Sequence, residues 1–303
     1  MVNEVIRLLV TTTGGIYVDA TVGSGGHSEA IGKKLSGSGR LICLDMDSDA
    51  IEISMGRLGS MGKTVSFKKA NFSEMDAVLE DLGVGKVNGI LLDLGMSSYQ
   101  LDQSGRGFSF NRDEPLDMRM DLNGGITAEK LVNSLSANEI VKILREYGEE
   151  KRAGLISKSI DRERRTQTIK SSLQLADLIR SIIPPSRRPG MKDPATRTFQ
   201  ALRIAVNNEL GNLKVFLDKA PNLMESGGRL VFLTYHSLED RLVKQAMTGW
   251  EKECICPPDI PECACDKIPL FKRVYKKGIK PNKTEIRENP RARSAMLRAA
   301  ERI

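Results

Sequence analysis

Two short segments of the chain place carboxylates and glycines in a spacing that suits ligand chemistry. The first, DATVGSGGH, begins at Asp19, and the second, DLGMSSYQ, begins at Asp93. Each follows an apolar run that predicts a buried strand. In open α/β sheets, ligands bind outside the carboxyl ends of the strands. A scaffold alone needs neither feature there, so the sequence predicts an enzyme.

The first segment contains a glycine turn, Gly23-Ser-Gly25-Gly26-His27, that would let the backbone approach a ligand closely. It resembles half of the dinucleotide-binding fingerprint, but Ser28 stands where the third glycine belongs. The chain also has no G-K-[ST] motif for a nucleoside triphosphate at this turn. A plain tight turn remains the alternative.

A second acidic site follows the next predicted strand, where the sequence DMDSD begins at Asp45. An acidic residue about 20 residues after such a turn can bind ribose hydroxyls, so Asp45 is the predicted ligand of an adenosyl cofactor. A calcium loop is disfavoured because Ala50 and Gly56 occupy the positions that need Gly and Glu. Helix capping would account for Asp47 and Asp49 without any ligand.

Two further groups complete the predicted site. Phe72 follows the third predicted strand and could stack on adenine, although a core position suits this ring equally well. Asp93 is followed by a glycine and by the hydroxyls of Ser97 and Ser98. This combination can bind a cationic or amine-bearing group and leave room for a planar substrate.

Apolar runs alternating with helix-like stretches would position these residues. The runs predict a parallel α/β sheet and cover residues 16–22, 40–44, 64–67, 88–94 and 229–235. Serine–carboxylate pairs predict helix starts at Ser73 and Ser237. The segments 271–277 and 294–300 predict an antiparallel strand pair, with a helix as the alternative for the second.

More than a hundred residues separate the fourth and fifth predicted strands, which is too long for a simple loop. Capping signatures at Ser136 and Ser171 predict that this insert is helical. We expect residues 106–197 to form the inserted domain and residues 1–105 and 198–303 to form the sheet domain. Apolar positions from Phe199 to Leu217 predict one long helix that returns to the sheet.

Charge is distributed unevenly along a chain whose net charge is +7. Residues 151–197 hold 12 basic and 4 acidic residues, and residues 267–303 hold 12 and 3. Such blocks predict contact with a nucleic acid, with ordinary solvated helix faces as the alternative. The predicted phosphate contacts are Arg162, Arg164, Arg165, Arg187, Arg188 and Arg197.

Four of the five cysteines form two C-x-C pairs, Cys254 with Cys256 and Cys263 with Cys265. Four thiolates can close a tetrahedral zinc site, but the spacing is tighter than the common C-x2-C pattern, and reduced surface thiols remain an alternative. The chain shows neither a signal peptide nor an apolar run of about 18 residues. We therefore expect a cytoplasmic protein, and both a monomer and a homodimer stay open.

Several longer segments, in order along nearly the whole chain, resemble the bacterial ribosomal small-subunit RNA cytosine-N4 methyltransferase family of the MraW type. They are residues 17–28 (YVDATVGSGGHS), 89–98 (GILLDLGMSS), 106–110 (RGFSF), 115–121 (PLDMRMD), 194–200 (PATRTFQ), 236–241 (HSLEDR) and 288–294 (ENPRARS). So many long segments are far more specific than one glycine turn.

The resemblance implies a Rossmann-like methyltransferase sheet, S-adenosylmethionine as methyl donor and a cytosine of 16S ribosomal RNA as acceptor. It also implies a role for the insert in RNA recognition. Carried over position by position, the cofactor-binding residues are Gly25, Gly26, His27, Asp45, Phe72, Asp93 and Gln100. The predicted catalytic residues are Asp93, Ser97 and Ser98, and Tyr99 or Phe108 could stack on a flipped-out base.

Two other classes of protein share parts of this pattern. A nicotinamide-dependent oxidoreductase would use the same sheet and Asp45, but the broken glycine fingerprint counts against it. A noncatalytic RNA-binding module would explain the basic blocks and leave the carboxylates without a purpose.

Overall fold

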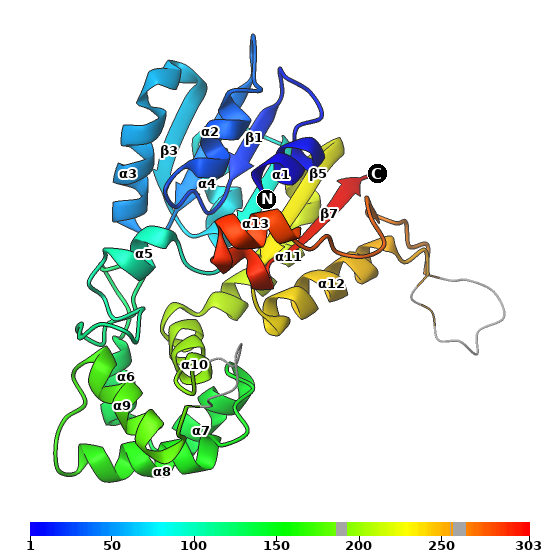
Figure 1. The fold of residues 1–303 in the computed structure, drawn as a ribbon. Coiled ribbons are helices and arrows are strands. Elements are labelled where there is room, and N and C mark those ends of the chain that lie inside the picture. Colours follow the sequence, from blue (N-terminus) through cyan, green and yellow to red (C-terminus); the bar gives the residue numbers. More distant parts are fainter. Residues whose placement is uncertain (186–192, 255, 257–264) are drawn as a thin grey trace. The chain divides into compact units, whose positions relative to one another are not determined.

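The computed structural model describes residues 1–185, 193–254, 256 and 265–303. The chain divides into two compact units, Met1–Gly95 with Leu210–Ile303, and Met96–Glu209 (Figure 1). The second unit extends beyond the insert predicted at 106–197 at both ends. Among the described residues, no helix is both long enough and apolar enough to cross a lipid bilayer.

The first unit is built on one sheet, which has seven strands within the described residues in the order β3-β2-β1-β4-β5-β7-β6. Strands β1 to β5 are parallel, whereas β7 runs antiparallel to β5 and β6. The strands are β1 Ile16–Asp19, β2 Arg40–Asp45, β3 Val65–Lys69, β4 Val87–Asp93, β5 Met224–Thr234, β6 Phe271–Arg273 and β7 Met296–Arg302. The predicted Rossmann-like α/β sheet and the C-terminal strand pair are confirmed.

Helices cover both faces of this sheet. One face carries α1 Val2–Leu9, α2 Gly26–Gly32 and α3 Ser48–Leu58, and the other carries α4 Met75–Asp81, α11 Glu209–Leu223 and α12 Ser237–Glu251. The unit also contains α13 Lys283–Glu288 and the 3-10 helices η1 Gly59–Thr64, η2 Phe72–Glu74 and η3 Pro290–Ser294.

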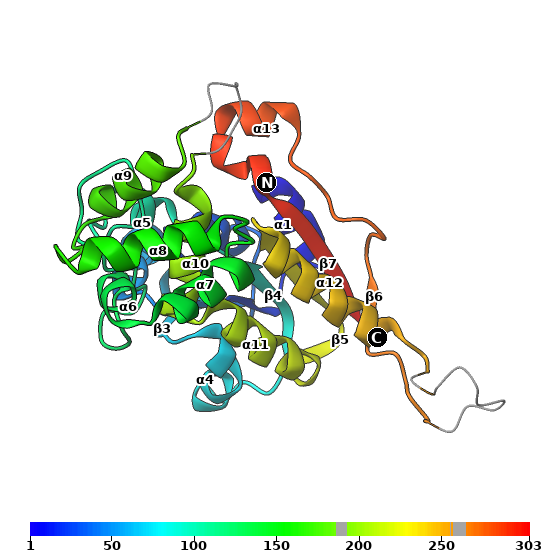
Figure 2. The same cartoon turned by 90° about the horizontal axis from the view of Figure 1, so that it is seen from below.

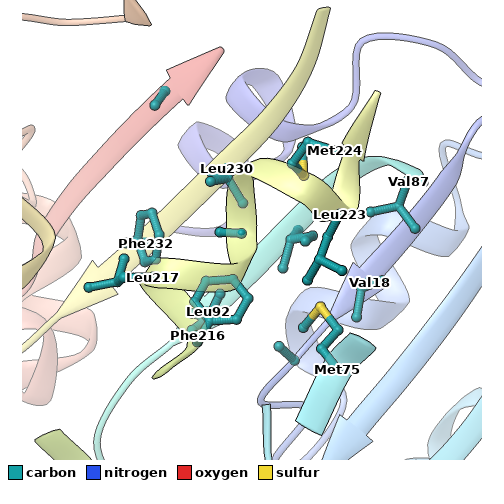
Figure 3. Close-up of a cluster of buried hydrophobic side chains, with 14 of the residues drawn as sticks. Val18, Met75, Val87, Leu92, Phe216, Leu217, Leu223, Met224, Leu230 and Phe232 are labelled. Carbon is teal, nitrogen blue, oxygen red and sulfur yellow. The ribbon is translucent and has the colours of Figure 1, made fainter. Parts of the chain in front are cut away.

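Strand residues alternate between two apolar clusters because successive side chains of a strand point to opposite faces. Val18 and its neighbour Ile90 lie in the cluster under α4, α11 and α12, where Phe216 of α11 packs edge-to-face on Phe232 (Figure 3). Tyr17 and Leu91 face the other way, toward α1 and α2. Burial on both faces fixes the strand register and therefore the position of the strand ends.

The named elements of the second unit are helices, which agrees with the expectation for the insert. They are α5 Ser98–Asp102, α6 Ala128–Ser134, α7 Ala137–Glu146, α8 Ala153–Arg164, α9 Ser172–Ile182 and α10 Thr196–Asn207. The predicted capping box at Ser136 is confirmed, and the Ser171 hydroxyl accepts a hydrogen bond from the Gln174 amide.

Three local predictions were wrong. The long helix expected from Phe199 to Leu217 is broken at Asn208, whose φ of 49° is left-handed, and Phe199 packs edge-to-face on Phe110 within the second unit. The helix start expected at Ser73 is capped by Asn71 instead, and the one expected at Ser237 is capped by His236. Those serines lie inside the first turn, where their neighbours already supply the side-chain acceptor.

Candidate active site

The glycine turn connects β1 to α2 and needs glycine at two positions. Gly23 and Gly25 have φ values of 51° and 80°, a left-handed region that side chains disfavour. A Cβ on Gly25 would lie in ordinary van der Waals contact with Ser54 and Arg57, at 3.4 Å, so the requirement for glycine comes from the backbone conformation. The backbone of this turn is therefore fixed by local sequence, and α2 begins directly after it at Gly26.

Asp45 stands at the end of β2 and braces this turn. One of its carboxylate oxygens accepts a hydrogen bond of 3.0 Å from the Gly23 amide, and the other accepts one of 3.0 Å from the Asp47 amide. Burial raises the pKa of Asp45 to about 6 from its ordinary 3.8. The group is still mainly ionised at pH 7 and can accept hydrogen bonds from a ligand.

Asp19, at the end of β1, holds the turn from inside. Its buried carboxylate accepts hydrogen bonds from the Ser28 hydroxyl at 2.6 Å and from the Thr21 amide at 3.3 Å. The Thr21 hydroxyl in turn accepts a hydrogen bond of 2.7 Å from the amide of Asp93. These contacts tie the turn after β1 to the end of the adjacent strand β4.

Asp93 ends β4 and lies between two aromatic side chains. The Tyr235 hydroxyl donates a hydrogen bond of 2.8 Å to Asp93 Oδ1, and His27 Nε2 lies 3.6 Å from Asp93 Oδ2. Tyr235 follows β5, and its amide donates to the carboxylate of Glu239 in α12. Residues from β1, β4 and β5 therefore meet at one edge of the sheet.

Burial controls the charge of this cluster. It raises the pKa of Asp93 to about 6, and the hydrogen bond from Tyr235 opposes that rise. Burial also lowers the pKa of His27, so the imidazole is neutral at pH 7. The buried Nδ1 atom of His27 has no hydrogen-bond partner among the described residues. At neutral pH the edge therefore presents two carboxylates and a neutral imidazole.

Phe72 lies after β3, in η2. Its half-buried ring packs edge-to-face on Phe216 with the centroids 6.1 Å apart. One side of the ring thus belongs to the core, and the ring remains partly exposed. Both roles that the sequence left open, packing and stacking on a ligand, are compatible with this position.

Ser97, Ser98 and Gln100 belong to the second unit, where they form the start of α5. The Ser97 hydroxyl accepts a hydrogen bond of 3.1 Å from the Gln100 amide, and the Gln100 side chain accepts one of 3.0 Å from the Ser97 amide. This capping box gives both residues a structural role. Ser98 is exposed at the first helical position.

The two aromatic residues proposed to stack on a base differ in exposure. Phe108 is 4% exposed, and the buried guanidinium of Arg106 lies 5.7 Å from its ring centroid. A buried ring covered in this way does not offer a stacking face, so Phe108 is withdrawn as a candidate. Tyr99 is half-buried.

The predicted phosphate contacts also differ. Arg164 is largely buried and donates hydrogen bonds of 2.8 and 2.6 Å to the carbonyls of Val132 and Leu135, where α6 ends, so its role is structural. Arg162, Arg165 and Arg197 are exposed, although Arg165 pairs with Asp161. Arg187, Arg188 and Cys263 lie outside the described residues.

Sequence reasoning missed Tyr235 and Thr21 as parts of the site. The signal for Tyr235 was its place directly after the β5 run, at the same sheet edge as Asp93. Thr21 lies inside the glycine-turn segment that the sequence did single out. The sequence could not show that both side chains form hydrogen bonds with Asp93.

Comparison with known proteins gives a family for the entire chain. Residues 1–303 match the MraW methylase family. A protein of Heliobacterium modesticaldum named Ribosomal RNA small subunit methyltransferase H is 47% identical over 304 residues, which cover 100% of this chain and 97% of that protein. A protein of the same name from Symbiobacterium thermophilum is 45% identical over 303 residues, which cover 100% of this chain and 95% of that protein. With this agreement along its full length, and with a Rossmann-like sheet that gathers carboxylates at one edge, the chain belongs to the MraW methylase family.

Proposed function

We propose that this protein transfers the methyl group of S-adenosylmethionine to the exocyclic N4 amine of a cytosine in 16S ribosomal RNA, in the cytoplasm. The observation that carries the proposal is the joining of Asp93, His27, Asp45 and the glycine turn at one sheet edge. The names of the full-length relatives, which specify ribosomal RNA of the small subunit, support the substrate class.

The residues at the sheet edge fit an adenosyl cofactor. The Asp45 carboxylate lies at the end of β2, where ribose hydroxyls are bound in related sheets, and Gly25 and Gly26 allow the backbone to approach the ligand. Phe72 offers a partly exposed ring for the adenine. The His27 Nδ1 atom is buried and has no protein partner among the described residues, so it can accept a hydrogen bond from the ligand. Gln100 completes the proposed set of cofactor-binding residues.

S-adenosylmethionine supplies the methyl group in an already activated form, so the protein mainly has to align the attacking nitrogen. The N4 lone pair of cytosine is delocalised into the ring, and positive charge develops on N4 as it attacks. An ionised Asp93 can accept a hydrogen bond from the amine and stabilise that charge. The new N–C bond forms as the S–C bond breaks with its electron pair left on sulfur, and the proton that N4 releases passes to the Asp93 carboxylate and from there to solvent. Ser97 and Ser98 are proposed as further acceptors, and Tyr99 as a stacking partner of the base.

Two measurements test the proposal. Calorimetry with S-adenosylmethionine and with NAD should detect binding of the first alone, which separates a methyltransferase from an oxidoreductase and from a noncatalytic RNA-binding module. Mass mapping of 16S ribosomal RNA from a deletion strain should show the loss of one N4-methylated cytosine, restored by the wild-type gene and not by Asp93→Asn. An unchanged modification map would overturn the substrate assignment.

A further inference from the structure

Three cysteine side chains gather beyond the end of α12, away from the residues assigned to methyl transfer. The Sγ atoms of Cys254, Cys256 and Cys265 all lie within 4.8 Å of one another. The sulfur atoms of Cys254 and Cys265 are 3.7 Å apart. We propose that these three thiolates bind a structural zinc ion, a site that has no part in the chemistry of the sheet edge.

The sulfur spacing suits a metal better than a disulfide. Tetrahedral zinc with Zn–S bonds of about 2.3 Å places its thiolates about 3.8 Å apart, close to the observed separation of Cys254 and Cys265. A disulfide needs about 2.05 Å and would use only two of the three sulfurs. The three residues supply three of the four ligands of a tetrahedral ion, and Cys263 lies outside the described residues.

A hydrogen bond joins two of the three cysteines. The backbone amide of Cys256 lies 3.3 Å from Cys254 Sγ and donates toward it. This contact holds two proposed ligands of one ion close together.

The segments before and after the cysteines are held together by hydrogen bonds between the end of α12 and the residues before β6. The Leu270 amide donates a hydrogen bond of 2.8 Å to the Trp250 carbonyl, and Lys267 Nζ donates one of 2.8 Å to the Gly249 carbonyl. The rings of Trp250 and Phe271 lie 4.7 Å apart. Figure 2 shows α12 running beside β6, so the chain leaves the helix and returns to the strand at neighbouring points.

A metal ion bound by the three cysteines would add a second link between the chain that leaves α12 and the chain that enters β6. Among the described residues between α12 and β6, Ile268 is 74% exposed, so its side chain contributes little burial. A cross-link between Cys254 and Cys265 restricts the chain between them and lowers the entropy lost on ordering it. The expected function of the ion is therefore to hold the chain that leaves α12 to the chain that approaches β6.

The test measures metal content of the full-length protein, purified under reducing conditions without chelators. Mass spectrometry of the metal should find about one zinc ion per chain. Cys254→Ser and Cys265→Ser should each lower this at least about tenfold, because each removes a ligand. Cys43→Ala is the matched control, since Cys43 is buried in β2, and it should keep the metal.

Replacement of zinc by Co²⁺ gives an independent readout. The wild-type protein should show the intense near-ultraviolet band of thiolate-to-cobalt charge transfer, and both serine variants should show a weaker one. Chelation should also speed cleavage by a protease within residues 252–270. Substoichiometric metal in the wild type, metal retained by both serine variants, or a Cys254–Cys265 disulfide in reduced protein would each overturn the proposal.

Discussion

At the scale of single residues, Asp93 depends on its neighbours for both position and charge. The Thr21 hydroxyl holds its backbone, and Tyr235 donates to one carboxylate oxygen. Burial raises the pKa of Asp93 to about 6, so the group changes charge just below physiological pH. If the ionised form supports methyl transfer, activity must fall as the pH drops through about 6.

Tyr235→Phe should shift the fall in activity at acidic pH to a higher pH. The lost hydrogen bond favours the carboxylate, so its removal raises the pKa of Asp93 by about one unit and lowers kcat near pH 6.5. The measurement is kcat against pH at saturating S-adenosylmethionine and RNA. Tyr275→Phe, at an exposed position, is the control and should leave the profile unchanged. An unshifted fall in activity in Tyr235→Phe would show that Asp93 does not set it.

Asp45→Asn should weaken cofactor binding. The amide loses the charge that strengthens hydrogen bonds to ribose, worth about 1.5–3 kcal/mol, or roughly 10- to 150-fold in Kd. It keeps one acceptor oxygen for the turn, and its NH2 group leaves one of the two backbone amides without an acceptor. Calorimetry with S-adenosylmethionine measures the change. Asp49→Asn, in the first turn of α3, should bind within about twofold of wild type. Equal affinity for wild type and Asp45→Asn would remove Asp45 from the site.

At the scale of elements, the break between α10 and α11 separates the two compact units along the chain. Asn208 adopts φ 49° and ψ 37°, a left-handed conformation in which Asn is tolerated better than most residues. The apolar spacing continues through this point, which is why periodicity predicted one helix. The break therefore depends on one polar residue, Asn208.

Substitutions at Asn208 should separate backbone strain from other effects. Asn208→Gly accepts the left-handed conformation and should change the free energy of unfolding by less than about 0.5 kcal/mol, whereas Asn208→Val should lower it by about 1–2 kcal/mol. Denaturant unfolding monitored by circular dichroism gives both values. Equal stability of the two variants would mean that the left-handed cap is not what the site requires.

At the scale of the whole molecule, basic residues are concentrated in segments that differ from those carrying the carboxylate site. Residues 151–197 hold 12 basic and 4 acidic residues, and the exposed members include Arg162 and Arg165 of the second unit. Binding of RNA through such side chains releases counterions and is therefore strongly salt-dependent. The structure also identifies Arg164 as a residue with a different, internal role.

Replacing these arginines should affect two different quantities. Arg162→Gln and Arg165→Gln should each reduce the slope of log affinity for ribosomal RNA against log salt by about 0.7, with little change in Tm. Arg164→Gln should instead lower Tm, because the carbonyls of Val132 and Leu135 lose their donor. Filter binding across a salt series and thermal melts measure the two effects. A flat salt response of the wild type would argue against phosphate contacts.

Much of the fold was predictable from sequence because buried strands appear as contiguous runs of apolar residues. The strands β1, β2 and β4 appear as apolar runs. The carboxylates Asp45 and Asp93 end β2 and β4, and the glycine turn follows β1. Parallel strands bring their carboxyl ends to one edge, so finding the strands was enough to predict that these residues meet. Helix caps were predicted less well, since several adjacent polar residues at η2 and α12 could serve.

The sequence by itself therefore determined the sheet, the acidic edge and the family of this protein, since each is written in contiguous segments. Only the tertiary structure decided that Tyr235 donates to Asp93, that Arg164 and Phe108 are internal, and that Cys254 and Cys265 meet. Those facts depend on side chains far apart along the chain, and local propensity carries no information about the direction in which such side chains point.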